Sequence, residues 1–135
     1  MLIGFPPCTY LCKAQIPLMH QQKRRIGLSI DALGLFSTML NCPIPCIALE
    51  NPVGIIGKYY KPQSQIIYPH WFGSPYHKEI GLWLKNLPPL IATQYSVHRK
   101  SMSNHVNGRM SQASKSKIRS KFFPQVAKAM AEQWS

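Results

Sequence analysis

Acidic residues are scarce in this chain of 135 residues, which has four aspartates and glutamates against 16 lysines and arginines. The formal net charge at pH 7 is therefore +12. A charge of this size attracts polyanions, so we expect nucleic acid or another anionic surface as the partner. The charge itself indicates nothing about the fold.

Long apolar runs are also missing. None approaches the ~20 residues that are needed to span a bilayer. The first residues, MLIGFPPC, lack the charged start and the longer apolar stretch of a secretory signal. Cysteines number only four, and without an export signal we expect free thiols in a reducing cytoplasm rather than a disulfide framework.

The balance of residue types nevertheless favours a folded protein. Hydrophobic residues make up 45% of the chain and charged residues 15%, which is enough apolar surface for a core and argues against disorder. The length is typical of one domain covering residues 1–135.

Two short apolar runs flank a helical pattern in the first 50 residues. Residues 2–5 end at two prolines and residues 47–49 end at Glu50-Asn51-Pro52, so both are predicted to be buried strands. Apolar residues recur at helical spacing over residues 25–40, while residues 9–23 are predicted to be loop. Strand, helix and strand form a βαβ unit, whose strands are parallel. The fold class is therefore α/β.

The remaining elements are predicted from the same kinds of signal. Strands are expected over residues 65–68 and 80–84, and a helix whose apolar stripe runs from Phe123 to Trp134. Trp71-Phe72 and Trp83 are expected to belong to the core rather than to a base-stacking platform. The segment 96–121 contains seven basic residues and no acid, and we expect a loop that contacts phosphates.

A thiol and a carboxyl follow the two predicted parallel strands. Cys8 comes directly after the Pro6-Pro7 turn, and Glu50 ends the second strand beside Asn51. Because the carboxyl ends of parallel strands share one sheet edge, where ligands of open α/β sheets bind, we expect Cys8 and Glu50 to face one cleft. Such a pair can activate a pyrimidine: the thiolate adds to carbon 6 while the acid protonates ring nitrogen 3, which makes carbon 5 nucleophilic toward a methyl group. The base must first be flipped out of the duplex.

Other interpretations of these residues stay open. A cysteine in a buried turn and a paired carboxyl at a strand end both occur without any catalytic role. Cys8-x-x-x-Cys12 and Cys42-x-x-x-Cys46 are able to form a four-thiolate zinc site, but the topology places the pairs at opposite sheet edges, so we predict no metal. The five histidines lack metal-binding spacing. Phe5-Pro6-Pro7-Cys8 also lacks the polar first and aromatic fourth residues of an amino-methyltransferase loop.

The whole pattern resembles the cytosine-5 DNA methyltransferases, most closely a small phage-type branch. The resemblance rests on PPCT at 6–9, ENPVG at 50–54, LWL at 82–84, LPPL at 87–90 and AMAEQW at 129–134. It implies a partial Rossmann-like methyltransferase sheet made of a βαβ unit, antiparallel strands and a C-terminal helix. It also implies Cys8 as the nucleophile, Glu50 as the residue that contacts the flipped cytosine, and Asn51 as an orienting neighbour. DNA is then the partner, S-adenosylmethionine the cofactor, and the cytoplasm of a bacterial host the compartment.

The same resemblance assigns binding residues. Phe5 and Pro6 beside the nucleophile, and Val126 and Ala127 on the C-terminal helix, are expected to border the cofactor. The residues expected to contact DNA are Pro7, Thr9, Lys78, Arg99, Lys100, Arg109, Lys115, Lys117, Arg119 and Lys121. Of these, the last seven belong to the basic segment 96–121.

The chain departs from the family in its cofactor-binding part. The larger family places a Gly-rich loop and an acidic residue for the ribose before the cysteine motif, whereas here the cysteine stands at position 8. Gly54 and Gly57 are a close glycine pair but lack the G-x-G-x-x-G form. Thr9 stands where most of the family has Gln, and Lys78 is the one candidate for the arginines that grip the base.

Two functional hypotheses follow. The first is a truncated or split cytosine-5 DNA methyltransferase that retains the catalytic half. The second is an inactive DNA- or protein-binding remnant, which acts as a decoy or as the partner of a separate chain that binds the cofactor.

Overall fold

The computed structural model describes residues 1–13, 16–97, 100–101, 111 and 122–135, which belong to two compact units. The first unit comprises Met1–Ile66 and Ile80–Pro89, and the second comprises Ile67–Glu79 and Leu90–Ser135. This division does not test whether the chain is a single domain, which stays a prediction.

A four-stranded mixed sheet has the strand order β1-β2-β5-β3. The strands are β1 (Leu2–Gly4), β2 (Ile47–Asn51), β3 (Gln65–Ile67) and β5 (Ile80–Lys85). β1 and β2 are parallel, with Gly4 opposite Leu49, and β5 runs antiparallel to β2, with Leu82 opposite Glu50. The predicted parallel pair with an antiparallel addition is confirmed, and the fold is a mixed α/β one.

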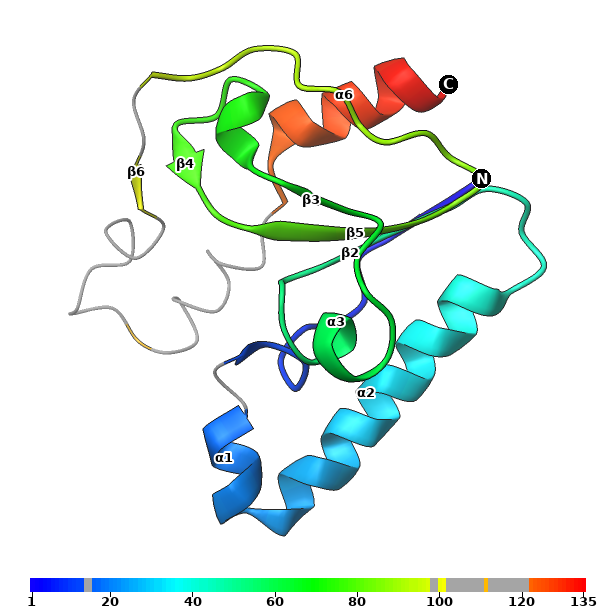
Figure 1. Cartoon of the computed structure of the whole chain (residues 1–135), viewed down its shortest axis with the longest axis vertical. Coiled ribbons are helices and arrows are strands. Elements are labelled where there is room, and N and C mark those ends of the chain that lie inside the picture. Colours follow the sequence, from blue (N-terminus) through cyan, green and yellow to red (C-terminus); the bar gives the residue numbers. More distant parts are fainter. Residues whose placement is uncertain (14–15, 98–99, 102–110, 112–121) are drawn as a thin grey trace. The chain divides into compact units, whose positions relative to one another are not determined.

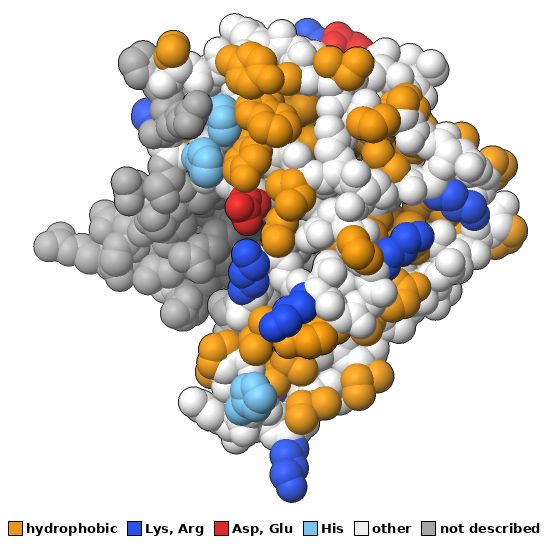
Figure 2. Space-filling model, viewed as in Figure 1, with side chains coloured by type: hydrophobic (Ala, Val, Ile, Leu, Met, Phe, Trp, Pro, Cys, Tyr) orange, Lys and Arg blue, Asp and Glu red, His pale blue; other side chains and the backbone are white. Residues whose placement is uncertain are grey.

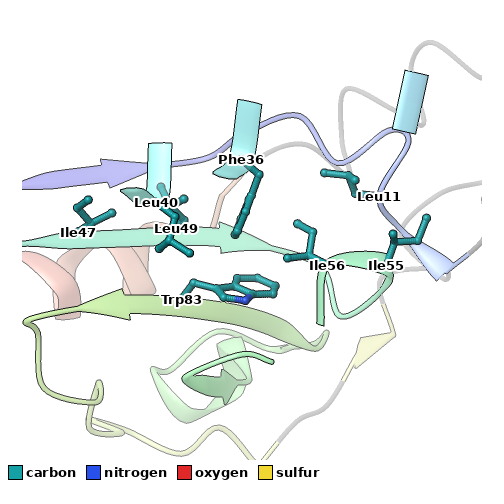
Figure 3. Close-up of a cluster of buried hydrophobic side chains, with 8 residues drawn as sticks. All are labelled: Leu11, Phe36, Leu40, Ile47, Leu49, Ile55, Ile56 and Trp83. Carbon is teal, nitrogen blue, oxygen red and sulfur yellow. The ribbon is translucent and has the colours of Figure 1, made fainter. Parts of the chain in front are cut away.

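The helix α2 (Lys23–Asn41) connects the two parallel strands, as the apolar spacing predicts (Figure 1). It ends where Cys42 adopts an extended backbone and Pro43 follows, because proline disfavours helical backbone in the residue before it. Phe36 points from α2 toward Trp83 of β5 (Figure 3). Their rings meet edge to face, with centroids 5.0 Å apart.

These two rings belong to the main hydrophobic cluster of the first unit. Its members are Leu11, Phe36, Leu40, Ile47, Leu49, Ile55, Ile56 and Trp83. Each is at most 5% exposed, and full burial of such a side chain contributes about 1.5–3 kcal/mol to folding. Trp83 is a core residue, as predicted.

Two short helices lie outside the predicted elements. The prediction of loop over residues 9–23 is wrong, because α1 (Ile16–Gln21) forms there and α2 already begins at Lys23. Ile16 and Met19 of α1 pack against the core cluster, and a helix of six residues gives too short an apolar pattern to detect. α3 (Ile55–Tyr59) follows β2 and contributes two side chains to the same cluster.

The second unit contains the short 3-10 helix η2 (Pro69–Trp71), the strand β4 (Tyr76–His77), the strand β6 (Lys100–Ser101) and the helix α6 (Pro124–Trp134). β4 and β6 are parallel, so the prediction of loop throughout 96–121 is wrong at β6, where backbone pairing decides the structure. The predicted C-terminal helix is confirmed, with Pro124 in its first turn and Val126, Ala129, Met130 and Trp134 buried.

Among the residues that the structure describes, none of the helices combines the length and the apolar character that a bilayer span requires.

Candidate functional site

The loop that follows β1 is held at two points, one against the last residue of β2 and one against the chain that follows it. The Asn51 side-chain Nδ2 donates a hydrogen bond to the Pro6 carbonyl oxygen at 2.9 Å. The Ile55 backbone N–H donates to the Leu11 carbonyl oxygen, also at 2.9 Å. Cys8 lies between these two anchored points, so its loop is fixed beside the end of the strand that carries Glu50.

The second anchor depends on the absence of a side chain at Gly54. A Cβ there would lie 2.5 Å from the Leu11 carbonyl oxygen and 3.1 Å from the Cys12 Cα. The first of these contacts is shorter than real Cβ contacts allow and the second is tight, so glycine is needed for the two segments to approach. Cys12 and Gly54 form an antiparallel bridge at this point. The glycine of the ENPVG sequence therefore shapes the cysteine loop.

Cys8 and Glu50 are both half-buried. Side chains alternate across a strand, and Leu49 belongs to the core cluster on the α2 side of the sheet. Glu50 therefore points to the opposite sheet face, where it lies across from the fully buried Leu82. The parallel pairing of β1 and β2 places the Cys8 loop and the end of β2 at one sheet edge, as predicted, and neither residue is sealed in the core. That the two side chains face one cleft stays a prediction.

Asn51 is 1% exposed and serves as a positioning residue for the loop. Its Oδ1 has no hydrogen-bond partner within the described part of the chain. Since its Nδ2 is used by the Pro6 carbonyl, the side chain links the two strand ends. The predicted catalytic role of Asn51 stays a prediction.

The other predicted DNA-binding residues have varied surroundings. Pro7 and Thr9 are exposed on the cysteine loop, and Lys100 is exposed in β6. Lys78 is half-buried, with its ammonium 5.9 Å from the centre of the Phe123 ring. Arg99, Arg109, Lys115, Lys117, Arg119 and Lys121 lie outside the described residues, so the predicted phosphate contacts of the basic segment are untested.

The predicted cofactor residues do not form a cradle within either unit. Phe5 is 48% exposed and Pro6 is buried in the first unit, whereas Val126 is buried and Ala127 exposed in the second. The glycine pair does not provide a cradle either, because the Gln63 side chain lies against Gly57 and the backbone of Leu11 and Cys12 lies against Gly54. S-adenosylmethionine as the cofactor stays a prediction.

None of the four cysteines, all of which the structure describes, forms a disulfide, and all four are half-buried. Cys42 follows α2 and Cys46 precedes β2, where the Cys46 thiol donates to the Asn86 carbonyl oxygen at 3.6 Å. Both therefore lie near the start of β2, away from the strand ends that Cys8 follows. Within the described ranges no three His, Cys, Asp or Glu side chains are grouped so that they could hold a metal ion.

Sequence reasoning missed an apolar cleft of about 540 Å³ in the first unit. It is lined by Ile16, Met19, His20, Lys23, Ile26, Ser29, Ile30, Leu33, Ile55 and Tyr59, from α1, α2 and α3. Ile26 and Ile30 belong to the helical apolar spacing of residues 25–40, yet they are 42% and 64% exposed. The cleft includes neither Cys8 nor Glu50.

Comparison with known proteins gives no match to a family model, a curated protein or a solved structure. The functional argument therefore depends on the residues and their geometry.

Proposed function

We propose that this chain is a homologue of the cytosine-5 DNA methyltransferases that carries out the base-activating part of the reaction. The observation that carries the proposal is the double anchoring of the Cys8 loop beside the end of β2, which bears Glu50. A parallel strand pair with an antiparallel neighbour supports a partial Rossmann-like sheet as the scaffold. The net charge of +12 supports DNA as the substrate.

The proposed chemistry begins at carbon 6 of an extrahelical cytosine. The Cys8 thiolate forms a bond to carbon 6 while the protonated Glu50 carboxyl donates its proton to ring nitrogen 3. Carbon 5 then has enamine character and accepts an electrophile. Loss of the proton from carbon 5, with expulsion of the thiolate and return of the nitrogen 3 proton to Glu50, restores the aromatic ring.

The reaction that we assign to this chain stops at the activated base and does not include methyl transfer. Because the glycine pair Gly54 and Gly57 lacks the G-x-G-x-x-G form, we propose that a separate chain supplies the cofactor-binding part, the partner that the sequence predicts. The activated base has a chemical signature of its own, since a proton from water can add at carbon 5 and the original hydrogen can then leave.

Exchange of the cytosine carbon 5 hydrogen with water therefore tests the proposal without a cofactor. The chain is incubated with duplex DNA that carries tritium at carbon 5 of cytosine, and tritium released to water is counted. We expect release by the natural chain and by Cys12→Ala, and none by Cys8→Ala. Cys12 is the matched control because it is also half-buried and lies in the same loop. Absence of release from the natural chain would refute base activation and favour the inactive remnant.

The carboxyl is tested in the same assay. Glu50→Gln removes the proton donor while keeping the size of the side chain, and we expect release to fall by about 10²- to 10⁴-fold, the usual contribution of a general acid. Glu132→Gln is the control, because Glu132 is exposed on α6 and pairs with Lys128 at 3.7 Å. Equal release by the two variants would remove Glu50 from the mechanism.

A further inference from the structure

A cluster of rings in the second unit is not used by the proposed chemistry. Tyr68 stands at its centre, with ring centroids 4.9 Å from His77, 5.1 Å from Trp71 and 5.5 Å from His70. His70 and His77 stack at 5.2 Å with an angle of 15° between their planes. Tyr95 extends the cluster, with its centroid 6.4 Å from that of Trp71. Five rings thus form one continuous group.

Backbone hydrogen bonds fix the positions of these rings. The Thr93 and Gln94 N–H groups both donate to the Trp71 carbonyl oxygen, at 3.1 and 3.0 Å. The Ser96 N–H donates to the His70 carbonyl oxygen at 2.8 Å. The segment that carries Tyr95 is therefore held along η2, and its ring is placed beside Trp71 before any ligand arrives. Such pre-organisation lowers the entropic cost of binding.

The cluster lies at the surface rather than in a core. Tyr95 is 69% exposed, His77 is exposed, and Tyr68 and Trp71 are half-buried. Only His70 is buried, at 4% exposure. Figure 2 shows histidine side chains beside a column of hydrophobic ones, over the part of the chain where Figure 1 labels β4. The prediction that Trp71 belongs to the core is wrong, whereas Phe72, at 3% exposure, does belong to it.

A lysine lies on the strand that pairs with β4, the strand that carries His77. Lys100 is exposed in β6, next to Tyr76 of β4 in the parallel register, and its N–H donates to the Pro75 carbonyl oxygen at 2.6 Å. The acid at the cluster, Glu79, accepts a hydrogen bond from the Tyr68 hydroxyl at 3.4 Å. Burial and this carboxylate raise the pKa of Tyr68, so its ring stays neutral at physiological pH.

We propose that the surface formed by Tyr68, Trp71, His77 and Tyr95 binds unpaired bases of single-stranded DNA by stacking. Partly exposed rings together with basic groups are the combination that binds single strands, because every base has a π face and every nucleotide a phosphate. In duplex DNA the base faces are covered by their neighbours, so single strands bind more tightly. The inference deepens the proposed function, on which it rests for the choice of DNA.

The test compares two DNA strands by fluorescence anisotropy of an end label. One is oligothymidylate of about 12 nucleotides, within the usual range of site sizes, and the other is an abasic strand of equal length and charge. We expect the natural chain to bind the strand with bases about 5- to 150-fold more tightly, the contribution of one stacked base. Equal affinities would show that only the backbone is bound and would overturn the proposal.

Substitutions at Tyr95 separate stacking from apolar contact. We expect Tyr95→Phe to retain the preference for bases and Tyr95→Leu, which keeps apolar bulk without a ring, to lose at least about 5-fold in affinity. Tyr59→Ala is the matched control, because Tyr59 is 62% exposed in the first unit, and it should bind as the natural chain does. An equal effect of Tyr95→Leu and Tyr59→Ala, with circular dichroism unchanged in both, would overturn the proposal.

Tryptophan fluorescence provides a direct readout of contact. Stacking on Trp71 should quench its emission, and Trp71→Phe should remove this quenching while anisotropy still reports binding. Quenching that survives Trp71→Phe would show that the bases do not stack on Trp71. Tighter binding of oligouridylate than of oligothymidylate would contradict the choice of DNA as the ligand. Base-dependent binding without tritium release would leave this inference standing and refute the proposed function, and the reverse pattern would do the opposite.

Discussion

The hydrogen bond from Asn51 to the Pro6 carbonyl oxygen makes a sharp prediction about stability. It joins residues 45 positions apart, and the Asn51 side chain is 1% exposed. Asn51→Ala removes the donor and leaves the carbonyl oxygen of the buried Pro6 without it. An unsatisfied buried group costs about 1–3 kcal/mol, so we expect the free energy of unfolding to fall by about that amount.

Asn51→Asp should lower the free energy of unfolding more than Asn51→Ala does at neutral pH, although aspartate is nearly the same size as asparagine. The amide donor is replaced by a carboxylate oxygen that faces the carbonyl oxygen of Pro6, so an attraction becomes a repulsion. A buried charge without a partner costs about 3–5 kcal/mol. The expected order of stability at pH 7 is natural chain, Asn51→Ala, then Asn51→Asp.

The Asn51→Asp deficit should depend on pH with a definite sign. Burial and the facing carbonyl oxygen raise the pKa of the new carboxyl in the folded state above its unfolded value of about 3.9. The protonated acid can donate to Pro6, as the amide does. The deficit relative to the natural chain is therefore smallest below about pH 4 and grows as the pH rises through the folded pKa.

Urea unfolding at a series of pH values measures this deficit, and Asn86→Asp is the control. The Asn86 Nδ2 also donates to a proline carbonyl, that of Pro45, at 2.7 Å, but Asn86 is exposed. Its φ of 53° is one that aspartate tolerates. We expect Asn86→Asp to lower the free energy of unfolding by less than about 1 kcal/mol, because water solvates both the new carboxylate and the Pro45 carbonyl oxygen. An equal loss of unfolding free energy in the two variants would refute the reasoning. So would a loss in Asn51→Asp that does not change with pH.

Four further predictions follow from the packing and the charge. Gly54→Ala should destabilise the first unit by about 1–3 kcal/mol in urea unfolding, because its Cβ would meet the Leu11 carbonyl oxygen. Gly27→Ala, with open space around the new Cβ in α2, should stabilise by about 1 kcal/mol. The raised pKa of Tyr68, due to burial and Glu79, means that the folded state holds this proton more tightly. Stability should therefore fall as the pH rises through about 10, a loss that Tyr68→Phe removes. DNA affinity, measured by anisotropy, should fall steeply between about 50 and 200 mM salt if several phosphates are contacted, and a flat response would exclude DNA as the partner.

The strands and long helices could be predicted because their signals are local and repeated. Residues 2–5 and 47–49 are apolar runs that end at prolines, and the helical spacing between them has the length of a crossover. The parallel pairing of β1 and β2 then follows from topology, and it places Cys8 after one strand and Glu50 at the end of the next. This much of the candidate site was accessible from the sequence.

The contacts that fix the site were not accessible in this way. The bond from Asn51 to Pro6 joins a side chain to a backbone oxygen far along the chain, and such a pair leaves no periodic pattern. α1 and η2 are too short to show a periodic pattern. The ring cluster forms because backbone hydrogen bonds bring Tyr95 to Trp71. Glycine at position 54 was a visible signal, but its meaning depends on the Leu11 carbonyl oxygen that lies against it.

Because the chain has only four acidic residues, the surroundings of each carboxyl group are informative about its role. Asp31 and Glu132 are exposed on helices, where water solvates them, and Glu79 is exposed and bonded to Tyr68. Glu50 is the half-buried one, on a sheet face beside buried Leu82, where a carboxylate costs free energy. A structural role would make Glu50→Gln lose stability, whereas a role in base activation would make it lose tritium release while the free energy of unfolding is kept or increased. The two measurements on this one variant therefore decide whether the anchored cysteine loop serves chemistry or only the fold.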